Sequence, residues 1–257
     1  MLLAELTEGS AHDAQRRAES VSLAQVEKHA LEVSAPLDAL SFLAPAAHIK
    51  VIAEVKRASP SRGDMASIPD PAALASIYEQ GGASAISVLT EERRFKGSLD
   101  DLRAVRARVS VPVLRKDFVS LPYQVFEARA AGADMVLLIV AALEQPVLSE
   151  LYELITSLGM TALVEAHSAD EVDRAVGLGA KLIGVNARDL NTFELDRELF
   201  GSVVDRIPAG TIRVAESAVR TADDVRHYSA AGADAVLVGE ALVTSDSLAT
   251  LHSFLEI

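Results

Sequence analysis

The chain has 257 residues, of which 50% are hydrophobic and 24% are charged, and this balance predicts a globular protein with a large core. Its formal net charge of −13 disfavours a nucleic-acid partner, because a phosphate backbone demands clustered lysine and arginine, although local cations can still bind a small anion. The absence of cysteine excludes a disulfide framework and a thiol nucleophile.

Signals for a membrane, for export and for a metal are missing. The longest apolar run, Met135 to Leu143, is too short to cross a bilayer, and the N-terminus lacks the basic-then-apolar order of a signal peptide. None of the six histidines stands in a short ligand pair, so we expect no metal and no other cofactor. The sequence therefore predicts a cytoplasmic protein without a membrane partner.

The first 50 residues differ from the rest of the chain. Leu2 to Val33 has a charge-rich helical pattern, which Pro36 and Pro45 then break. We expect residues 1–50 to form a helical extension. It would cover the bottom or the edge of the domain that follows, or act as a lid near its active site.

From residue 51 onward, strand and helix patterns alternate. Helix starts are indicated at Asp70-Pro71, Ser168–Glu171 and Thr221–Asp224, which have the spacing of N-caps. Strands separated by helices indicate parallel βαβ units, and eight units fit a closed (β/α)8 TIM barrel over residues 51–257 better than an open sheet. The predicted strands are 51–56, 85–90, 111–117, 134–140, 161–166, 182–187, 212–217 and 235–240.

A Gly-Ala pair recurs before four of these strands, about every two βα units, which supports the barrel. The glycines are Gly82, Gly132, Gly179 and Gly232. Each is predicted to take the left-handed conformation that ends a helix, rather than to bind a ligand.

Polar residues lie at the carboxyl ends of five predicted strands. Glu54 and Lys56 are two positions apart and therefore face the same side, where burial is costly unless the charges pair or do chemistry. The others are Lys116, Glu165, Asn186, Arg188 and Glu216. Because the active sites of such barrels lie at the carboxyl ends of the strands, these residues predict an acid–base site; the alternative is an ion-pair layer that fills the barrel.

The loops after the last two strands suggest a phosphate site. They contain Ser217, Ala218, Gly239 and Glu240, whose backbone N–H groups would surround the anion. We expect the side chain of Glu240 to point away from it and a helix that starts near Ser245 to Ser247 to lie behind these loops. The alternative is that Ala218 and Gly239 are tight-turn residues.

Several motifs together resemble the indole-3-glycerol-phosphate synthase family of tryptophan biosynthesis. They follow in the family's order across some 190 residues, and the helical extension is also similar. The segments are Ala53–Gly63 (AEVKRASPSRG), Phe95–Ser98 (FKGS), Pro112–Phe118 (PVLRKDF), Leu163–His167 (LVEAH), Gly184–Leu190 (GVNARDL) and Val214–Ser217 (VAES).

The resemblance implies a lyase that closes an indole ring. The substrate would be 1-(2-carboxyphenylamino)-1-deoxyribulose 5-phosphate, and the products indole-3-glycerol phosphate, carbon dioxide and water. Lys116 matches the general acid and Glu165 the general base. Lys56 would pair with the substrate, near its phosphate, and act as the acid in dehydration.

The resemblance also implies roles for the surrounding side chains. Glu54 and Glu216 would polarise the amine or orient the lysines, and Asn186 would bind the sugar hydroxyls. Arg188 and Ser59 would lie near the anthranilate carboxylate. The apolar residues that would pack on the substrate are Phe118, Leu137, Leu190 and Leu237. A weak homodimer, or docking onto other enzymes of the pathway, is left open.

One residue departs from the family pattern, and two other functions were weighed. Ala218 stands where glycine is usual, so its methyl group would crowd the phosphate or forbid a positive φ, with a small backbone shift and modestly weaker binding. A phosphoribosylanthranilate isomerase would need a Cys–Asp pair, and the chain has no cysteine. A non-catalytic scaffold would be expected to lose Lys116 or Glu165, and both are present.

Overall fold

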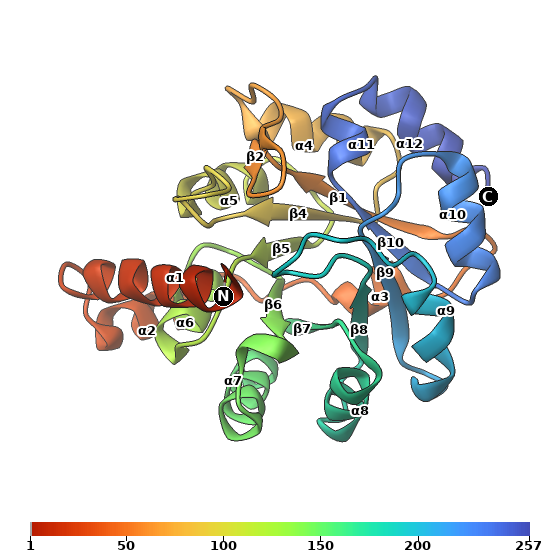
Figure 1. The fold of residues 1–257 in the computed structure, drawn as a ribbon. Helices are drawn as coiled ribbons and strands as arrows, with labels where there is room; N and C mark the ends of the chain where they lie inside the picture. The colour runs from red at the N-terminus through yellow and green to blue at the C-terminus, as the bar shows by residue number, and fades with distance from the viewer. Residues whose placement is uncertain (1) are drawn as a thin grey trace.

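A computed structural model describes residues 2–257 and contains a closed barrel of parallel strands surrounded by helices (Figure 1). Around the barrel the strands follow the order β1-β10-β9-β8-β7-β6-β5-β4, so the first and last strands pair and close the ring. Their bounds are β1 Lys50–Val55, β4 Ala85–Leu89, β5 Val113–Lys116, β6 Met135–Ile139, β7 Thr161–Ala166, β8 Leu182–Asn186, β9 Ile212–Glu216 and β10 Ala235–Val238.

The predicted (β/α)8 fold is confirmed, and the strand limits differ by a few residues at most. β5 begins at Val113 rather than at residue 111, because Pro112 has no N–H to donate to a neighbouring strand. β10 ends at Val238 rather than at residue 240, because Gly239 already caps the short helix α11, Glu240–Val243.

The helices alternate with the strands on the outside of the ring (Figure 1). They are α4 Pro71–Gln80, α5 Leu99–Arg106, α6 Pro122–Ala130, α7 Gln145–Ser157, α8 Ala169–Gly177, α9 Leu199–Val203, α10 Ala222–Ala230, α11 and α12 Ser247–Leu255, with 3₁₀ turns at Val140–Ala142 and Val204–Arg206. The four repeated glycines that follow helices have φ between 74° and 96°, so their predicted left-handed conformation is confirmed.

The predicted helix starts are also found. Asp70 Oδ1 accepts a hydrogen bond from Ala73 N at 2.9 Å, and Thr221 forms a reciprocal capping box with Asp224. At α8 the box is incomplete: Ser168 Oγ accepts from Glu171 N at 3.3 Å, but the Glu171 carboxylate accepts from His167 N at 2.8 Å instead of returning to Ser168.

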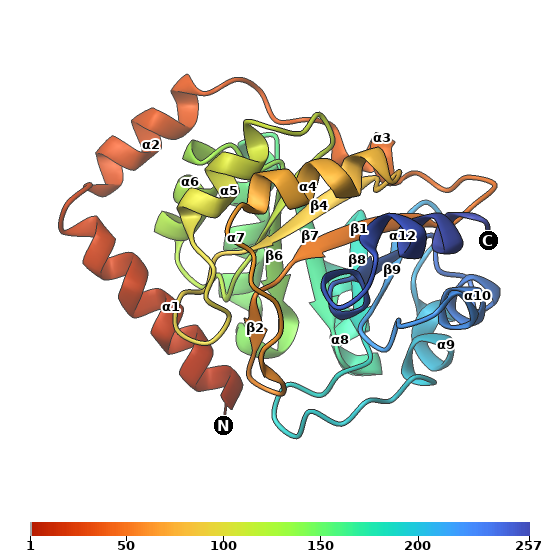
Figure 2. The same ribbon diagram turned by 90° about the horizontal axis from the view of Figure 1, so that it is seen from above.

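The N-terminal segment reaches both ends of the barrel (Figure 2). Helix α3, Ala39–Leu43, buries Ala39 and Leu43 in one apolar cluster with residues at the amino ends of the strands, such as Met135. Helix α2, Leu23–Glu32, packs on α6. The first turns of helix α1, Leu2–Ala18, reach the opposite, carboxyl end, while the rest of the helix runs along the side of the barrel (Figure 2). The sequence analysis offered a cover for the bottom, a cover for the edge and a lid near the active site as alternatives, and different parts of this one segment lie at all three places. The domain boundary at residue 50 stays a prediction.

A small hairpin after β1 is absent from the sequence prediction. Strands β2, Ala58–Ser59, and β3, Gly63–Asp64, pair antiparallel. They form a small hairpin that Figure 2 shows near the label of β2, and Gly63, directly after the turn, has a positive φ of 67°. Strands of two residues are too short to show a periodic pattern in the sequence, so the hairpin could not be predicted from it.

Within residues 2–257, no helix has the length and apolar character to span a membrane.

Candidate active site

A pocket opens at the carboxyl ends of the barrel strands and has two adjoining lobes. The first, which we call the apolar lobe, has an empty volume of about 830 Å³ including its open mouth, and the second, the polar lobe, extends toward the loops after β9 and β10. Both are lined by Glu54, Lys56, Lys116, Asn186, Arg188, Ser217 and Glu240. The pocket therefore offers one end to an apolar group and the other to an anion, with charged groups between them.

Every residue that the sequence analysis assigned to the site lines one or both lobes. Those confined to the apolar lobe are Ser59, Phe118, Leu137, Glu165 and Leu190. Those confined to the polar lobe are Glu216, Ala218, Leu237 and Gly239. Leu237 thus lies apart from the other three apolar residues expected to pack on the substrate.

Two lysines and three buried glutamates meet between the lobes. Lys56 Nζ lies 2.6 Å from Glu54 Oε1, and Lys116 Nζ lies 3.4 Å from Glu165 Oε2 and 3.5 Å from Glu216 Oε2. The side chains of the three glutamates are 1–2% exposed. Ionised groups at such depth require nearby opposite charges, which the two lysines supply.

Burial and the neighbouring charges shift the pKa values of Lys116, Glu165 and Glu216 in different ways. Burial opposes the charge of Lys116, but Glu165, Glu216 and Glu54 outweigh it and raise the pKa of Lys116 above its usual range. Burial opposes the charge of Glu165 too, but Lys116 and His167 outweigh it and lower the pKa of Glu165. Burial and then the charge of Glu165 raise the pKa of Glu216 well above its ordinary value. At neutral pH Lys116 is thus charged and Glu165 is a carboxylate, while the raised pKa of Glu216 makes this group easier to protonate than an ordinary glutamate.

Asn186 is held by its neighbours at the end of β8. Its Oδ1 accepts hydrogen bonds from Ser217 Oγ at 2.8 Å and from Arg188 N at 3.0 Å. The amide Nδ2 is left as the group that can donate to a bound molecule. Arg188 Nη1 donates to the carbonyl of Phe193 at 3.3 Å, which fixes the guanidinium at the rim of both lobes.

The loops after β9 and β10 correct one expectation and confirm part of another. Ala218 has a φ of 54° and Ser217 a φ of 66°, so the alanine methyl does not forbid a positive φ. The expected helix start near Ser245 to Ser247 is found at Ser247, where Asp246 caps α12; the short helix α11, which begins at Glu240 directly after Gly239, was not predicted.

Gly239 and Glu240 have contacts that the sequence did not reveal. A Cβ atom on Gly239 would lie 2.7 Å from Glu54 Oε1. This glycine therefore makes room for the side chain of Glu54 and not only for a bound phosphate. The Glu240 carboxylate is paired with Arg62 in the β2–β3 turn, which neutralises it beside the polar lobe. In the same way, Gly184 on β8 makes room for Glu216, because a Cβ there would lie 2.0 Å from Glu216 Oε1.

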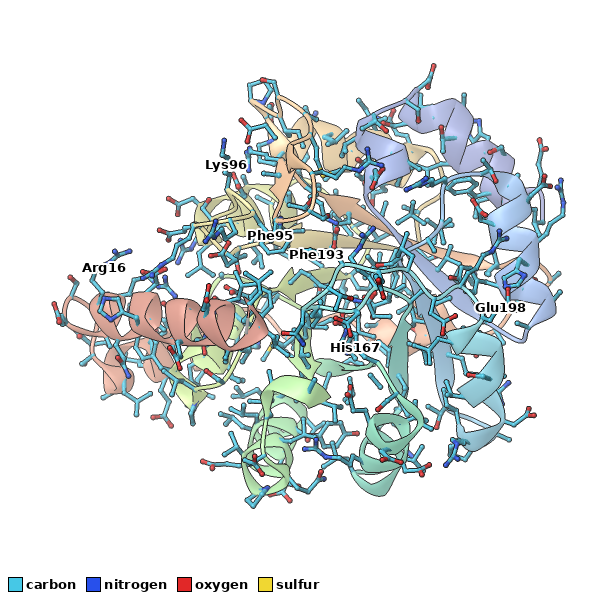
Figure 3. The ribbon with its side chains drawn as sticks, viewed as in Figure 1. Arg16, Phe95, Lys96, His167, Phe193 and Glu198 are labelled. Carbon is cyan, nitrogen blue, oxygen red and sulfur yellow. The ribbon has the colours of Figure 1, made fainter. Side chains whose placement is uncertain are left out.

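Several lining residues were missed by the sequence analysis. Leu2 and Leu6 reach the apolar lobe from α1, and Phe95 packs on Phe118 with ring centroids 6.0 Å apart. Figure 3 shows Phe95, Phe193 and His167 near the barrel axis, unlike the peripheral Arg16 and Glu198. His167 was part of a quoted motif but received no role; its position two residues after Glu165 is the signal that could have found it.

Comparison with known proteins decides the family. The family model described as indole-3-glycerol phosphate synthase matches residues 3–254. The chain belongs to this family. A protein named indole-3-glycerol phosphate synthase from Leifsonia xyli is 69% identical over 253 residues, covering 98% of this chain and 97% of its own length. One of the same name from Mycolicibacterium vanbaalenii is 61% identical over 244 residues, covering 95% and 89%.

Solved structures with little sequence identity share the fold of this indole-3-glycerol phosphate synthase family member. The N-acetylmannosamine-6-phosphate 2-epimerase from Clostridium perfringens has a TM-score of 0.59 at 17% identity, with 76% of this chain and 87% of that chain covered. A thiamine phosphate pyrophosphorylase from Pyrococcus furiosus has a TM-score of 0.60 at 15% identity, with 80% and 93% covered. At these identities the likeness concerns the barrel alone.

Proposed function

We propose that the chain converts 1-(2-carboxyphenylamino)-1-deoxyribulose 5-phosphate into indole-3-glycerol phosphate, carbon dioxide and water, with Lys116 as general acid and Glu165 as general base. Family membership supports the reaction. The observation that carries the residue roles is the position of Lys116 Nζ, between Glu165 and Glu216 at the junction of the two lobes. An ammonium held there can stabilise an oxygen that becomes negative.

The two lobes support one orientation of the substrate. The anthranilate ring enters the apolar lobe, against Phe118, Leu137 and Leu190, with its carboxylate toward Arg188 and Ser59. The phosphate enters the polar lobe, near Lys56 and the loops that contain Ser217, Ala218, Gly239 and Glu240. The ketone then lies between the lobes, where the charged groups gather.

Ring closure uses Lys116. The ring carbon that bears the carboxylate forms a bond to the ketone carbon, and the carbonyl electron pair moves to the oxygen, which takes a proton from the Lys116 ammonium. The bond to the carboxylate then breaks, carbon dioxide leaves, and its electron pair restores the aromatic ring. Glu165 and Glu216 hold Lys116 in place for this transfer, and Asn186 binds a sugar hydroxyl through Nδ2.

Dehydration completes the indole. The new hydroxyl leaves as water with a proton from Lys56, whose ammonium Glu54 holds at 2.6 Å. Glu165 removes the proton whose loss forms the double bond, and its lowered pKa keeps it ionised for this role. The steps form one carbon–carbon bond, break one carbon–carbon and one carbon–oxygen bond, and transfer protons, with no electrons supplied to or taken from the substrate, so the proposal includes no cofactor.

The substrate class and location follow from the same argument. The substrate is a small phosphorylated anion, and the enzyme would act in the cytoplasm. It could form a weak homodimer or dock onto other enzymes of tryptophan biosynthesis, and both arrangements stay open.

A turnover assay with the carboxyphenylamino-deoxyribulose phosphate, followed by indole fluorescence, tests the reaction. We expect saturable product formation. A folded protein that binds this substrate but forms no indole product would refute the proposal.

A further inference from the structure

His167 lies where β7 ends, between two carboxylates. Its Nε2 is 3.3 Å from Glu165 Oε1, and its Nδ1 is 3.3 Å from Glu171 Oε2. The ring is only 11% exposed. It comes from the same strand end as Glu165 and points toward the centre of the barrel (Figure 3).

Glu171 is itself fixed in position. It lies in the first turn of α8, where its backbone N–H donates to Ser168 Oγ at 3.3 Å, and its carboxylate accepts from His167 N at 2.8 Å. This second contact explains why the capping box of α8 stays incomplete. The Glu171 carboxylate thus contacts both the backbone N–H and the ring Nδ1 of His167.

Two carboxylates around one imidazole favour its charged form. A neutral imidazole can donate from only one nitrogen, so one of the two glutamates would face a lone pair. The imidazolium has a proton on both nitrogens: Nδ1 is within hydrogen-bonding distance of Glu171, and Nε2 forms a close ion pair with Glu165 without the alignment of a hydrogen bond. Burial alone would lower the pKa of His167, but Glu165 and Glu171 outweigh it and raise this pKa to about 10.

We propose that His167 is a positioning residue for Glu165: held as an imidazolium by Glu171, it keeps Glu165 ionised and turns Oε2 of that carboxylate toward Lys116. The inference rests on the role of Glu165 proposed above. Glu165 contacts its two cations with different oxygens, Oε1 toward His167 and Oε2 toward Lys116.

The need for a second cation follows from the reaction itself. Lys116 loses its charge when it donates a proton, and at that moment Glu165, which is 1% exposed, would remain as a buried carboxylate beside a neutral amine. The Glu165 carboxylate would then tend to take up a proton, and a protonated Glu165 could not act as the base. His167 takes no part in the transfer, so its charge persists through the step.

The other charged groups around the pair do not replace His167. Glu165 also faces Glu216 on β9, which contributes last and least to the lowering of its pKa, and, beyond Lys116, Glu54 on β1; neither group supplies a positive charge. The pKa of Asp189, after β8, is lowered mainly by the backbone N–H groups of Thr192 and Asn191, and the charge of His167 adds the last contribution. Within the described part of the chain, Lys116 and His167 are thus the cations that act on Glu165.

The test compares His167→Gln and Glu171→Gln with the wild type across pH. Glutamine keeps a hydrogen-bond donor but removes the cation, so the pKa of Glu165 rises and the acid limb of kcat should move up by about 1–3 pH units. Below the midpoint of the wild-type acid limb, kcat should fall at least about tenfold, and the loss should become smaller as the pH rises toward 8.5. KM should change less than about threefold, since substrate contacts remain. Glu171→Gln should shift the limb in the same direction by less.

His227→Gln is the matched control. This histidine lies on the outer helix α10, with Nε2 3.7 Å from Glu198, and lines neither lobe. Its replacement should leave the pH profile unchanged. A loss of kcat in His167→Gln by the same factor at every pH would indicate a merely structural role and overturn the proposal, as would an unchanged kcat.

A second measurement needs no substrate. NMR of the protein with isotope-labelled histidine, in which the His167 signal is identified by its loss in His167→Gln, should show a charged ring at pH 8. A neutral ring at pH 7 would overturn the inference by itself. Because this result is independent of turnover, it separates a failure of the present inference from a failure of the proposed reaction.

Discussion

Ala218→Gly should give a higher free energy of unfolding than an alanine-to-glycine substitution at a site with a negative φ. Ala218 has a φ of 54°, in the left-handed region where the Cβ atom of an L-residue approaches the following carbonyl oxygen. Glycine has no Cβ and adopts this conformation without strain. The usual family residue at this position is therefore the one that the backbone favours.

The magnitude can be isolated with a control substitution. The left-handed conformation costs an L-residue about 1–2 kcal/mol, whereas glycine loses roughly 0.4–1 kcal/mol more chain entropy than alanine on folding. Ala231, just after α10, is also half-buried against the same core but has a φ of −78°. Because Ala218→Gly and Ala231→Gly share the entropy cost, the difference between them should equal the released strain, about 1–2 kcal/mol.

Equilibrium urea denaturation of both variants and the wild type measures this difference. We expect Ala231→Gly to be less stable than the wild type and Ala218→Gly to be equal or more stable, with an unchanged or lower KM. If both variants lose the same stability, the left-handed strain at Ala218 is not real and the reasoning fails.

Four further outcomes are expected. Lys116→Met should lower kcat by about 100-fold or more with a smaller change in KM, because it removes the charge at the ketone oxygen; near-normal turnover would contradict the assignment. Gly239→Val should lower kcat as well as raise KM, since its Cβ would lie 2.7 Å from Glu54 Oε1; a pure KM effect in steady-state kinetics would show that Glu54 is undisturbed. Activity should survive EDTA, because no group of three or more His, Asp or Glu within residues 2–257 could hold a metal ion, and a loss restored by added Mg²⁺ would count against this. His167 has a pKa raised from 6.5 to about 10, so its stabilisation is fully present below pH 6.5 and is lost as pH rises through 10; the urea midpoints of wild type and His167→Gln should converge over that window.

The barrel and most of its candidate site were predictable because both follow local rules. Each polar strand-end residue, such as Lys116 or Glu165, interrupts an apolar run, and parallel strands bring their carboxyl ends to one side. The fold is confirmed by the structure, whereas the roles of these residues stay predictions.

The residues that were missed depend on contacts distant in the sequence. Leu2 and Leu6 continue an ordinary amphipathic pattern, and nothing local indicates that α1 reaches the pocket. The position of Gly239 against Glu54 requires β1 and β10 to be neighbours, which only the closed ring reveals. Ala218 was treated as an obstacle to a positive φ, but the surrounding fold imposes that conformation.

The pairing of β1 with β10 sets the order in which the enzyme can become active. Glu54 and Lys56 come from the first barrel strand, and the loop of Gly239 and Glu240 from the last, so these halves of the pocket meet only when the seam closes. Such a distant pairing must overcome loop-closure entropy before its contacts contribute. A chain still on the ribosome, or a refolding intermediate without this seam, would have an incomplete pocket and would catalyse nothing, whatever secondary structure it had formed. Recovery of activity is thus a direct signal of barrel closure.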